Sequence, residues 1–240
     1  VLGRRWAVAI LPPAECLAMI APLAVVAAPV ATGRMVLHLR GISGSGKSWL
    51  VYQLLQDPAL RWQEDRGLPL DPHLPQQRLV LRGYTAPDHG LAIVGPYRTA
   101  CGGCDAVPTQ DEIGLRIKAY AALRYHVVFE GLLASGLASR YEQLAAELAM
   151  CGVTYYGVWL DTPLAQCLAR VQARRAARGD DRPFNSHNTI AKHARVTKCL
   201  QRMQALGYHT ELLPMANGAG VPRLRALLGL QQGPGEEGVL

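Results

Sequence analysis

The feature that most constrains this 240-residue chain is the stretch GISGSGKS at positions 41–48. It follows MVLHLR, residues 35–40, whose alternating apolar and polar side chains predict a short buried strand. It precedes WLVYQLLQ, a helical pattern that ends near Asp57 and Pro58. The spacing G-x-x-x-x-G-K-S between a strand and a helix is that of a phosphate-binding loop (P-loop). The sequence therefore predicts a nucleotide-binding α/β unit.

Each residue type in this loop has a chemical reason. Gly41, Gly44 and Gly46 let the backbone curl so that its N–H groups face a phosphate, at the positive end of a helix. Lys47 is expected to bridge the β- and γ-phosphates of ATP, and Ser48 to ligate Mg²⁺. Trp49 has no hydroxyl group, so only its backbone N–H can contact a phosphate. The residues expected to bind ATP here are Gly41, Ser43, Gly44, Ser45, Gly46, Lys47, Ser48 and Trp49.

The stretch HVVFEG, residues 126–131, predicts a second strand that ends in Glu130. In P-loop proteins an acidic residue at the tip of a neighbouring strand orients the hydrated Mg²⁺, so Glu130 is the second expected metal residue; a glutamate in solvent is the alternative. Further strands are expected within residues 91–95, 152–161 and 208–213, and helices from Thr162-Pro163 and over 221–228. This alternation predicts a P-loop kinase fold, a parallel sheet flanked by helices.

A basic helix–loop–helix at about residues 170–195 predicts a lid over the phosphates. Arg170, Arg174 and Arg178 recur at four-residue spacing, and Arg175 joins them. Phosphoryl transfer requires positioning and charge neutralisation, so we expect Arg170 to bind the nucleotide and Arg174 and Arg175 to act in catalysis. A solvated basic helix face is the alternative for each arginine. The chain lacks an N-K-x-D guanine reader and is short for a motor ATPase, which favours a kinase.

The stretch YRTACGGCDAVPTQDEI, residues 97–113, allows a metal clamp, a redox pair or a turn that presents Asp105. A zinc site needs three or four ligands, and the sequence has no second C-x-x-C or C-x-x-H pair, so we expect no zinc and a structural role for Cys101 and Cys104. Thr109 and Glu112 form a capping box for the next helix. Because Asp105 has no such local role, it is the expected catalytic base.

The ends of the chain differ from the part between them. Residues 1–34 are rich in Ala, Pro and Val and are expected to be a non-structural extension, arising from an upstream start with Met35 as the true first residue. A secretory signal peptide is an alternative, and a membrane span fits less well because prolines and Glu15 interrupt it. Residues 35–230 are then the kinase domain and 231–240 a flexible tail. A nucleotide-dependent enzyme without a disulfide framework points to the cytoplasm and to no membrane partner.

Four blocks beyond the loop resemble one known family: VGPYRTACGGCDAVPTQDEI, VVFEGLLAS, LDTPLAQCLARVQARR and PFNSHNT. They are similar to the bacteriophage P-loop kinases called 5-hydroxymethyluracil DNA kinases, over about Met35 to Leu228. The resemblance implies transfer of the ATP γ-phosphate to the hydroxymethyl group of 5-hydroxymethyluracil in phage DNA, within thymidine hypermodification, in the host cytoplasm.

The acceptor has two alternatives at this stage. A kinase of a free nucleoside or another small hydroxyl metabolite would use the same loop and lid, and a non-catalytic nucleotide-binding regulator would keep Lys47 and Ser48 without a base. The net charge of +7 suits an anionic partner such as DNA. Tyr84, Tyr97 and Tyr141 are candidate stacking residues for a base, although ordinary packing is the commoner role for each.

Overall fold

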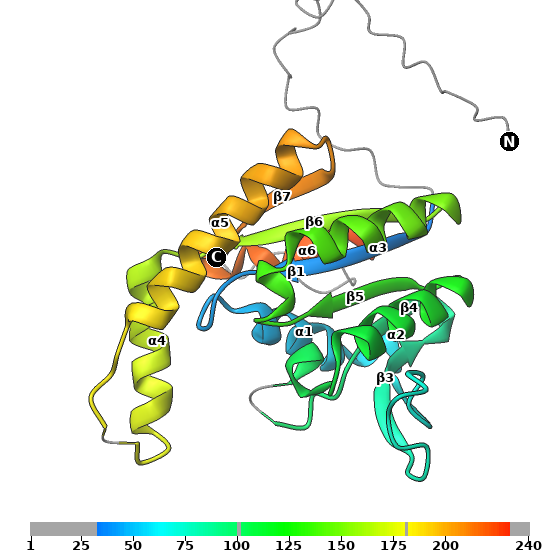
Figure 1. The fold of residues 1–240 in the computed structure, drawn as a ribbon, viewed down its shortest axis with the longest axis horizontal. Coiled ribbons are helices and arrows are strands. Elements are labelled where there is room, and N and C mark those ends of the chain that lie inside the picture. The colour runs from blue at the N-terminus through cyan, green and yellow to red at the C-terminus, as the bar shows by residue number, and fades with distance from the viewer. Residues whose placement is uncertain (1–32, 100–101, 181, 231–240) are drawn as a thin grey trace, which may run out of the picture.

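The computed structural model describes residues 33–99, 102–180 and 182–230. Seven strands form one sheet in the order β2-β3-β4-β5-β1-β6-β7 (Figure 1). The strands are β1 (Met35–Arg40), β2 (Gln63–Gly67), β3 (Val80–Ala86), β4 (Leu91–Val94), β5 (His126–Glu130), β6 (Thr154–Asp161) and β7 (His209–Pro214). The loop-bearing strand β1 lies between β5 and β6, so the carboxyl ends of these strands meet at one edge of the sheet.

The five strands from β4 to β7 in this order run parallel, which confirms the predicted parallel sheet. The sheet continues with β3, antiparallel to β4, and β2, antiparallel to β3. This two-stranded edge was not predicted, because Gln63 to Arg66 is a run of polar and charged residues without an apolar alternation.

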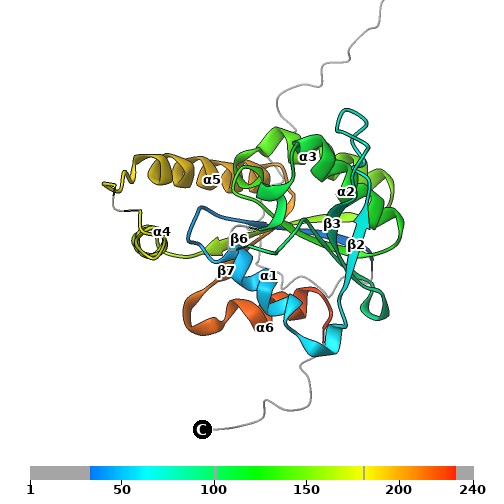
Figure 2. The ribbon, with the colours of Figure 1, turned by 90° about the horizontal axis from the view of Figure 1, so that it is seen from below.

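Helices cover both faces of the sheet (Figure 2). On one face α1 and α6 pack on Leu37 and Leu39 of β1, and on the other face α2, α3 and α5 pack on Val36 and its neighbours. This alternation along β1 follows the two-residue period of a strand that is buried on both faces. The helices are α1 (Lys47–Leu55), α2 (Gln110–Ala122), α3 (Ala138–Met150), α4 (Leu164–Ala176), α5 (His187–Ala205) and α6 (Gly220–Leu227).

Two of these helices form an arm that projects from the domain. Figure 2 shows α4 and the adjacent part of α5 reaching away from α1, α2 and α6. The lid arm, residues 164–205, contains the helix–loop–helix that the sequence predicts at about 170–195. It is longer than predicted because α5 continues into the core, where Val196, Cys199 and Met203 are buried.

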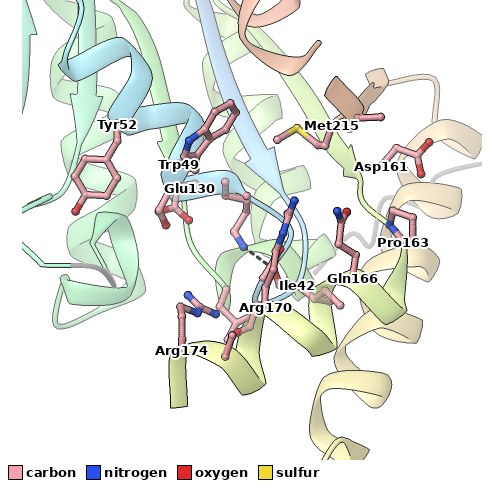
Figure 3. A pocket seen from close by; sticks show the side chains of 18 of the residues that line it. Ile42, Trp49, Tyr52, Glu130, Asp161, Pro163, Gln166, Arg170, Arg174 and Met215 are labelled. Atoms are coloured by element: carbon pink, nitrogen blue, oxygen red, sulfur yellow. Dashed lines mark hydrogen bonds between the residues drawn. The ribbon is translucent and has the colours of Figure 1, made fainter. Parts of the chain in front are cut away.

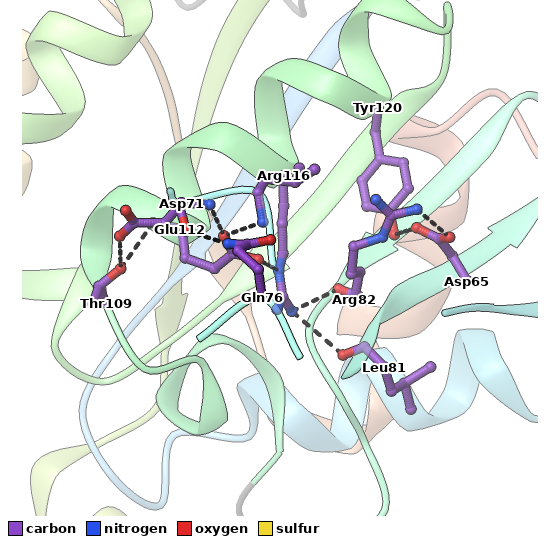
Figure 4. Close-up of polar contacts among 10 residues, drawn as sticks. Asp65, Asp71, Gln76, Leu81, Arg82, Thr109, Glu112, Arg116 and Tyr120 are labelled. Atoms are coloured by element: carbon purple, nitrogen blue, oxygen red, sulfur yellow. Dashed lines mark hydrogen bonds and ion pairs between the residues drawn. The ribbon is translucent and has the colours of Figure 1, made fainter. Parts of the chain in front are cut away.

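The start of α2 confirms half of the predicted capping box (Figure 4). The Thr109 hydroxyl accepts a hydrogen bond from the Glu112 backbone N–H at 3.0 Å, as an N-cap should. The Glu112 side chain does not return to Thr109. Its carboxylate instead accepts the N–H groups of Leu70 and Asp71 at 2.7 and 2.6 Å and pairs with Arg116 at 2.7 Å. Glu112 therefore anchors the segment between β2 and β3.

The helix that the sequence places from Thr162-Pro163 is α4. The helix begins at Leu164 after Pro163, and the Thr162 side chain does not cap it. The buried Thr162 hydroxyl donates instead to the Ser45 carbonyl at 2.8 Å. Thr162 therefore joins the base of the lid arm to the phosphate-binding loop.

The predicted boundary at Met35 excludes one residue that belongs to the domain. The Arg34 side chain donates to the carbonyls of Ala121 and Cys151, and the Arg34 carbonyl accepts from Thr154 N. Gly33 is the only other residue of the predicted extension that the structure describes. Residues 1–32 and the predicted tail, residues 231–240, lie outside the described residues. No helix in the described part of the chain has the length and apolarity that a bilayer span requires.

Candidate active site

The phosphate-binding loop connects β1 to α1 in a conformation that requires glycine. Gly44 has φ +85° and Gly46 has φ +103°, and residues that carry a side chain rarely adopt such values. A Cβ on Gly44 would lie 2.4 Å from the Cys167 carbonyl oxygen, so α4 packs directly on the loop. Of the eight loop residues expected to bind ATP, Ser43, Gly44, Gly46, Lys47, Ser48 and Trp49 line one cleft.

Gly41 and Ser45 are buried behind this cleft and support the loop. The Gly41 N–H donates to the Ser135 hydroxyl at 3.2 Å, and that hydroxyl donates to the Gly131 carbonyl at 2.6 Å. Ser135 thus joins the first loop residue to the segment after β5. Sequence reasoning did not single out Ser135, because its partner lies 94 residues away in the chain.

Lys47 is folded onto its own loop. Its ammonium donates to the carbonyls of Gly41 and Ile42 at 2.9 and 3.1 Å, and only 6% of the residue is exposed. Burial lowers the pKa of Lys47 below its ordinary value, and the carboxylates of Glu130 and Asp105 oppose that shift. The ammonium therefore lies in the cleft among the groups that an anionic phosphate would meet.

Ser48 and Glu130, the two residues expected to ligate Mg²⁺, are in direct contact. The Ser48 hydroxyl donates to the Glu130 carboxylate at 2.9 Å, and Glu130 is 1% exposed. Burial raises the pKa of Glu130, while Lys47 and the Ser48 hydrogen bond oppose the rise. A hydroxyl beside a buried carboxylate fits Mg²⁺, which usually takes one or two protein oxygens and completes its shell with water and phosphate.

Asp105 lies on a 3₁₀ turn, Gly103–Ala106, at the same cleft. Its carboxylate accepts the Leu132 N–H at 2.8 Å to each oxygen. Gly103 has φ +73°, and a Cβ there would lie 2.5 Å from a Glu130 carboxylate oxygen. A glycine at position 103 allows this turn to pack against Glu130, and Asp105 therefore lies close to Glu130 and Gly131 at the end of β5.

One of the two cysteines of this stretch, Cys104, lies among the described residues. Cys104 is buried within the turn Gly103–Ala106, which is compatible with the structural role expected for it, and burial raises the pKa of its thiol. Cys101 lies outside the described residues. Within the described part of the chain, no three His, Cys, Asp or Glu side chains form a group that could hold a metal ion.

The lid arm contributes two of its three predicted arginines to the cleft (Figure 3). Arg170 donates to the Gly44 carbonyl at 3.1 Å, and Arg174 lines the wall one turn further along α4. Arg175 does not line the cleft. Its guanidinium lies 3.2 Å from Asp180, donates to the Arg182 carbonyl and stacks over the Phe184 ring, so it holds the lid turn together.

The cleft has a volume of about 1270 Å³ and extends beyond the predicted residues. Its far side is formed by Asp161 at the end of β6, by Pro163 and Gln166 after it, and by the segment Met215–Gly218 after β7. Residues that follow the carboxyl ends of parallel strands gather at one edge, and this rule could have identified them. The three candidate stacking tyrosines do not line it: Tyr97 and Tyr141 are buried, and Tyr84 is half-buried.

The buried guanidinium of Arg40 supports the phosphate-binding loop through Ser135. Arg40, the last residue of β1, is fully buried; its guanidinium donates to the Ser135 carbonyl at 3.1 Å and the Tyr155 hydroxyl at 2.9 Å. It also lies over the rings of Tyr141 and Trp159. Tyr155 is also bonded to His38 Nδ1, at 2.6 Å. This network joins β1 to β6 and to the turn after β5.

Comparison with known proteins identifies relatives across most of the chain. The sequence model of the 5-hmdU DNA kinase family matches residues 18–221. A 5-hmdU DNA kinase of Pseudomonas phage PaMx11 is 34% identical over 176 residues, 72% of this chain and 86% of the relative. The 5-hmdU DNA kinase of Pseudomonas phage M6 is 31% identical over 169 residues, 65% and 81% of the two chains.

More distant similarities also occur. A 5-hmdU DNA kinase of Delftia phage PhiW-14 is 26% identical over 187 residues, 73% of this chain and 66% of the relative. Among solved structures, a chain from the PezAT chromosomal toxin–antitoxin system of Streptococcus pneumoniae covers 83% of this chain and 80% of its own length, at 12% identity and a TM-score of 0.42. That structural similarity is too weak to bear on function.

Proposed function

Because this chain belongs to the 5-hmdU DNA kinase family, we propose that it transfers the γ-phosphoryl group of ATP to the hydroxymethyl group of 5-hydroxymethyluracil in DNA. Family membership confirms the resemblance predicted from the four sequence blocks and the expectation of a kinase. The observation that carries the proposal is one cleft that contains a P-loop lysine, a hydroxyl–carboxylate pair, a separate aspartate and two lid arginines.

The residues divide the reaction among them. Lys47 exchanges its two loop carbonyls for the β- and γ-phosphate oxygens of ATP, and Arg170 and Arg174 neutralise the same phosphates from the lid arm. Ser48 and Glu130 would hold Mg²⁺, which would supply neutralisation of the phosphate charge during transfer. The neighbouring loop N–H groups orient the phosphate chain.

Asp105 acts on the acceptor. Its carboxylate, fixed by the Leu132 N–H, orients the hydroxymethyl group and takes its proton. The acceptor oxygen forms a bond to the γ-phosphorus as the bond to the β–γ bridging oxygen breaks. The products are ADP and a phosphomonoester on the base. Because the hydroxymethyl group is attached to a base within DNA, the base must leave the stack or be approached through the major groove.

The proposal is tested with a panel of acceptors and γ-labelled ATP. Wild-type protein is incubated with a duplex containing 5-hydroxymethyluracil, the same duplex with thymine, and the free nucleoside. We expect label only on the modified duplex, and none with Lys47→Ala. Transfer to the free nucleoside alone would indicate a metabolite kinase, and transfer to no acceptor by folded, ATP-binding protein would indicate a nucleotide-binding regulator.

A further inference from the structure

The lid arm contains the entire excess positive charge of the chain. Residues 164–205 include nine Lys and Arg and two Asp, a formal net charge of +7, which equals the net charge of all 240 residues. The remainder of the chain is therefore balanced in formal charge. An arm that only covered ATP would need cations on its cleft side alone, and the arm has cations elsewhere as well.

The two helices of the arm direct their cations to different places. On α4, Arg170 and Arg174 line the cleft. On α5, Arg195 and Lys198 are exposed, outside the cleft, and neither forms an ion pair or hydrogen bond with the described residues. Three-residue spacing places them along one side of the helix, beside its buried face. Arg202 continues this side and is held by Glu142 at 2.6 and 2.7 Å.

This side of α5 adjoins an exposed apolar turn. Leu133 and Leu137, which are 63% and 37% exposed, flank the 3₁₀ turn Ala134–Gly136. A Cβ on Gly136 would lie 3.0 Å from the Cδ atom of Arg195, so the arginine stem packs on this turn. Apolar and cationic side chains thus share one surface.

The same turn begins at the acceptor end of the cleft. Leu132 lines the cleft, and its N–H binds the Asp105 carboxylate. Leu133, the next residue, points its own N–H to Asp105 at 3.4 Å. The exposed leucines therefore lie within a few residues of the group proposed to activate the acceptor.

We propose that Leu133, Leu137, Arg195 and Lys198 form a docking surface for the DNA that carries the target base. The proposal rests on the proposed function, because a base within DNA brings flanking phosphates and neighbouring bases to the edge of the cleft. Arg195 and Lys198 contact those phosphates, and the leucines pack against the bases exposed when the target leaves the stack. In this arrangement α4 contacts ATP and α5 contacts DNA.

The cationic part is tested with the double variant Arg195→Gln/Lys198→Gln. The matched control, Arg78→Gln/Arg124→Gln, removes the same charge from exposed positions outside the lid arm and the cleft. Binding to a labelled duplex with 5-hydroxymethyluracil is measured by fluorescence anisotropy at several salt concentrations. Two lost phosphate contacts reduce the slope of log K against log[salt] by about 1.8 and weaken binding about 60-fold near 0.1 M salt.

The control variant should bind DNA within about two-fold of wild type, and both variants should keep the wild-type KM for ATP. Equal weakening of binding by both double variants, or an unchanged salt slope in the arm variant, would overturn the docking surface. Transfer to the modified duplex is measured in parallel. If wild type transfers phosphate and the arm variant binds the duplex as tightly as wild type, the docking surface is refuted and the proposed function is not. If wild type transfers no phosphate, the proposed function is refuted, and the comparison of binding still tests the docking surface.

The apolar part is tested with Leu133→Ala. Its side chain is exposed, so the fold should be retained. We expect a several-fold rise in the KM for the modified duplex with an unchanged salt slope, because the truncation removes an apolar contact and no charge. A KM for the duplex equal to that of wild type would remove Leu133 from the docking surface.

Discussion

Replacing Asp105 by Asn tests the proposed catalytic base with little change in structure. The Asp105 carboxylate accepts the Leu132 N–H through both oxygens, and an asparagine carboxamide keeps one oxygen for it. Exchanging a charged acceptor for a neutral one weakens such hydrogen bonds by about 1 kcal/mol, a decrease of about 2–4 °C in Tm for a domain of this size. The domain should therefore stay folded.

The catalytic loss should be much larger. General-base catalysis contributes about 10²- to 10⁴-fold, which corresponds to about 2.7–5.4 kcal/mol in the activation barrier. Because Lys47, Ser48 and Glu130 remain in place, we expect Asp105→Asn to reduce kcat on the modified duplex by that factor. The affinity for ATP should remain within a few-fold of wild type.

The assay follows labelled phosphate from ATP to a duplex with 5-hydroxymethyluracil. The control is Asp111→Asn, which removes the same charge from an exposed residue paired with Arg140 outside the cleft. The control should retain most of the activity. A rate for Asp105→Asn near that of wild type would refute the assignment, and a large loss in Asp111→Asn would transfer the role to that residue.

Three further predictions concern the loop, the metal pair and the core. Lys47→Ala should abolish transfer with an unchanged circular dichroism spectrum, since the side chain bonds only to loop carbonyls; measurable turnover would mean that the loop is not the active site. Glu130→Gln should raise the Mg²⁺ concentration for half-maximal rate, because the amide keeps the Ser48 contact and loses the charge; wild-type Mg²⁺ dependence would contradict the metal role. Burial, with Arg40 and Lys47 nearby, lowers the pKa of His38 in the folded protein well below 6.5, so below pH 6.5 only the unfolded chain takes up this proton. As the pH falls below 6.5, the free energy of unfolding of wild type, measured with urea, should therefore decrease by about 1.4 kcal/mol per pH unit more than that of His38→Gln. Equal decreases in the two proteins would show that His38 titrates normally.

The parts of the site that the sequence could predict depend on short-range geometry. The spacing of Gly44, Gly46, Lys47 and Ser48 is set by the backbone of one loop and the first turn of one helix, so local pattern was sufficient. Glu130 was predictable for a related reason. Parallel strands end at the same edge of a sheet, and a carboxylate at the tip of β5 therefore lies beside a loop at the tip of β1.

The remaining features depend on partners far away in the chain. Thr109 caps α2 through a bond three residues away, whereas the Glu112 carboxylate bonds to residues 41 and 42 positions earlier. Arg174 and Arg175 are neighbours of the same type, and only the packing of α4 on Gly44 decides which one faces the cleft. Local hydrogen bonds and turns are encoded in the spacing of a few residues, but the orientation of a helix and the choice of a distant partner are settled only when whole elements pack together.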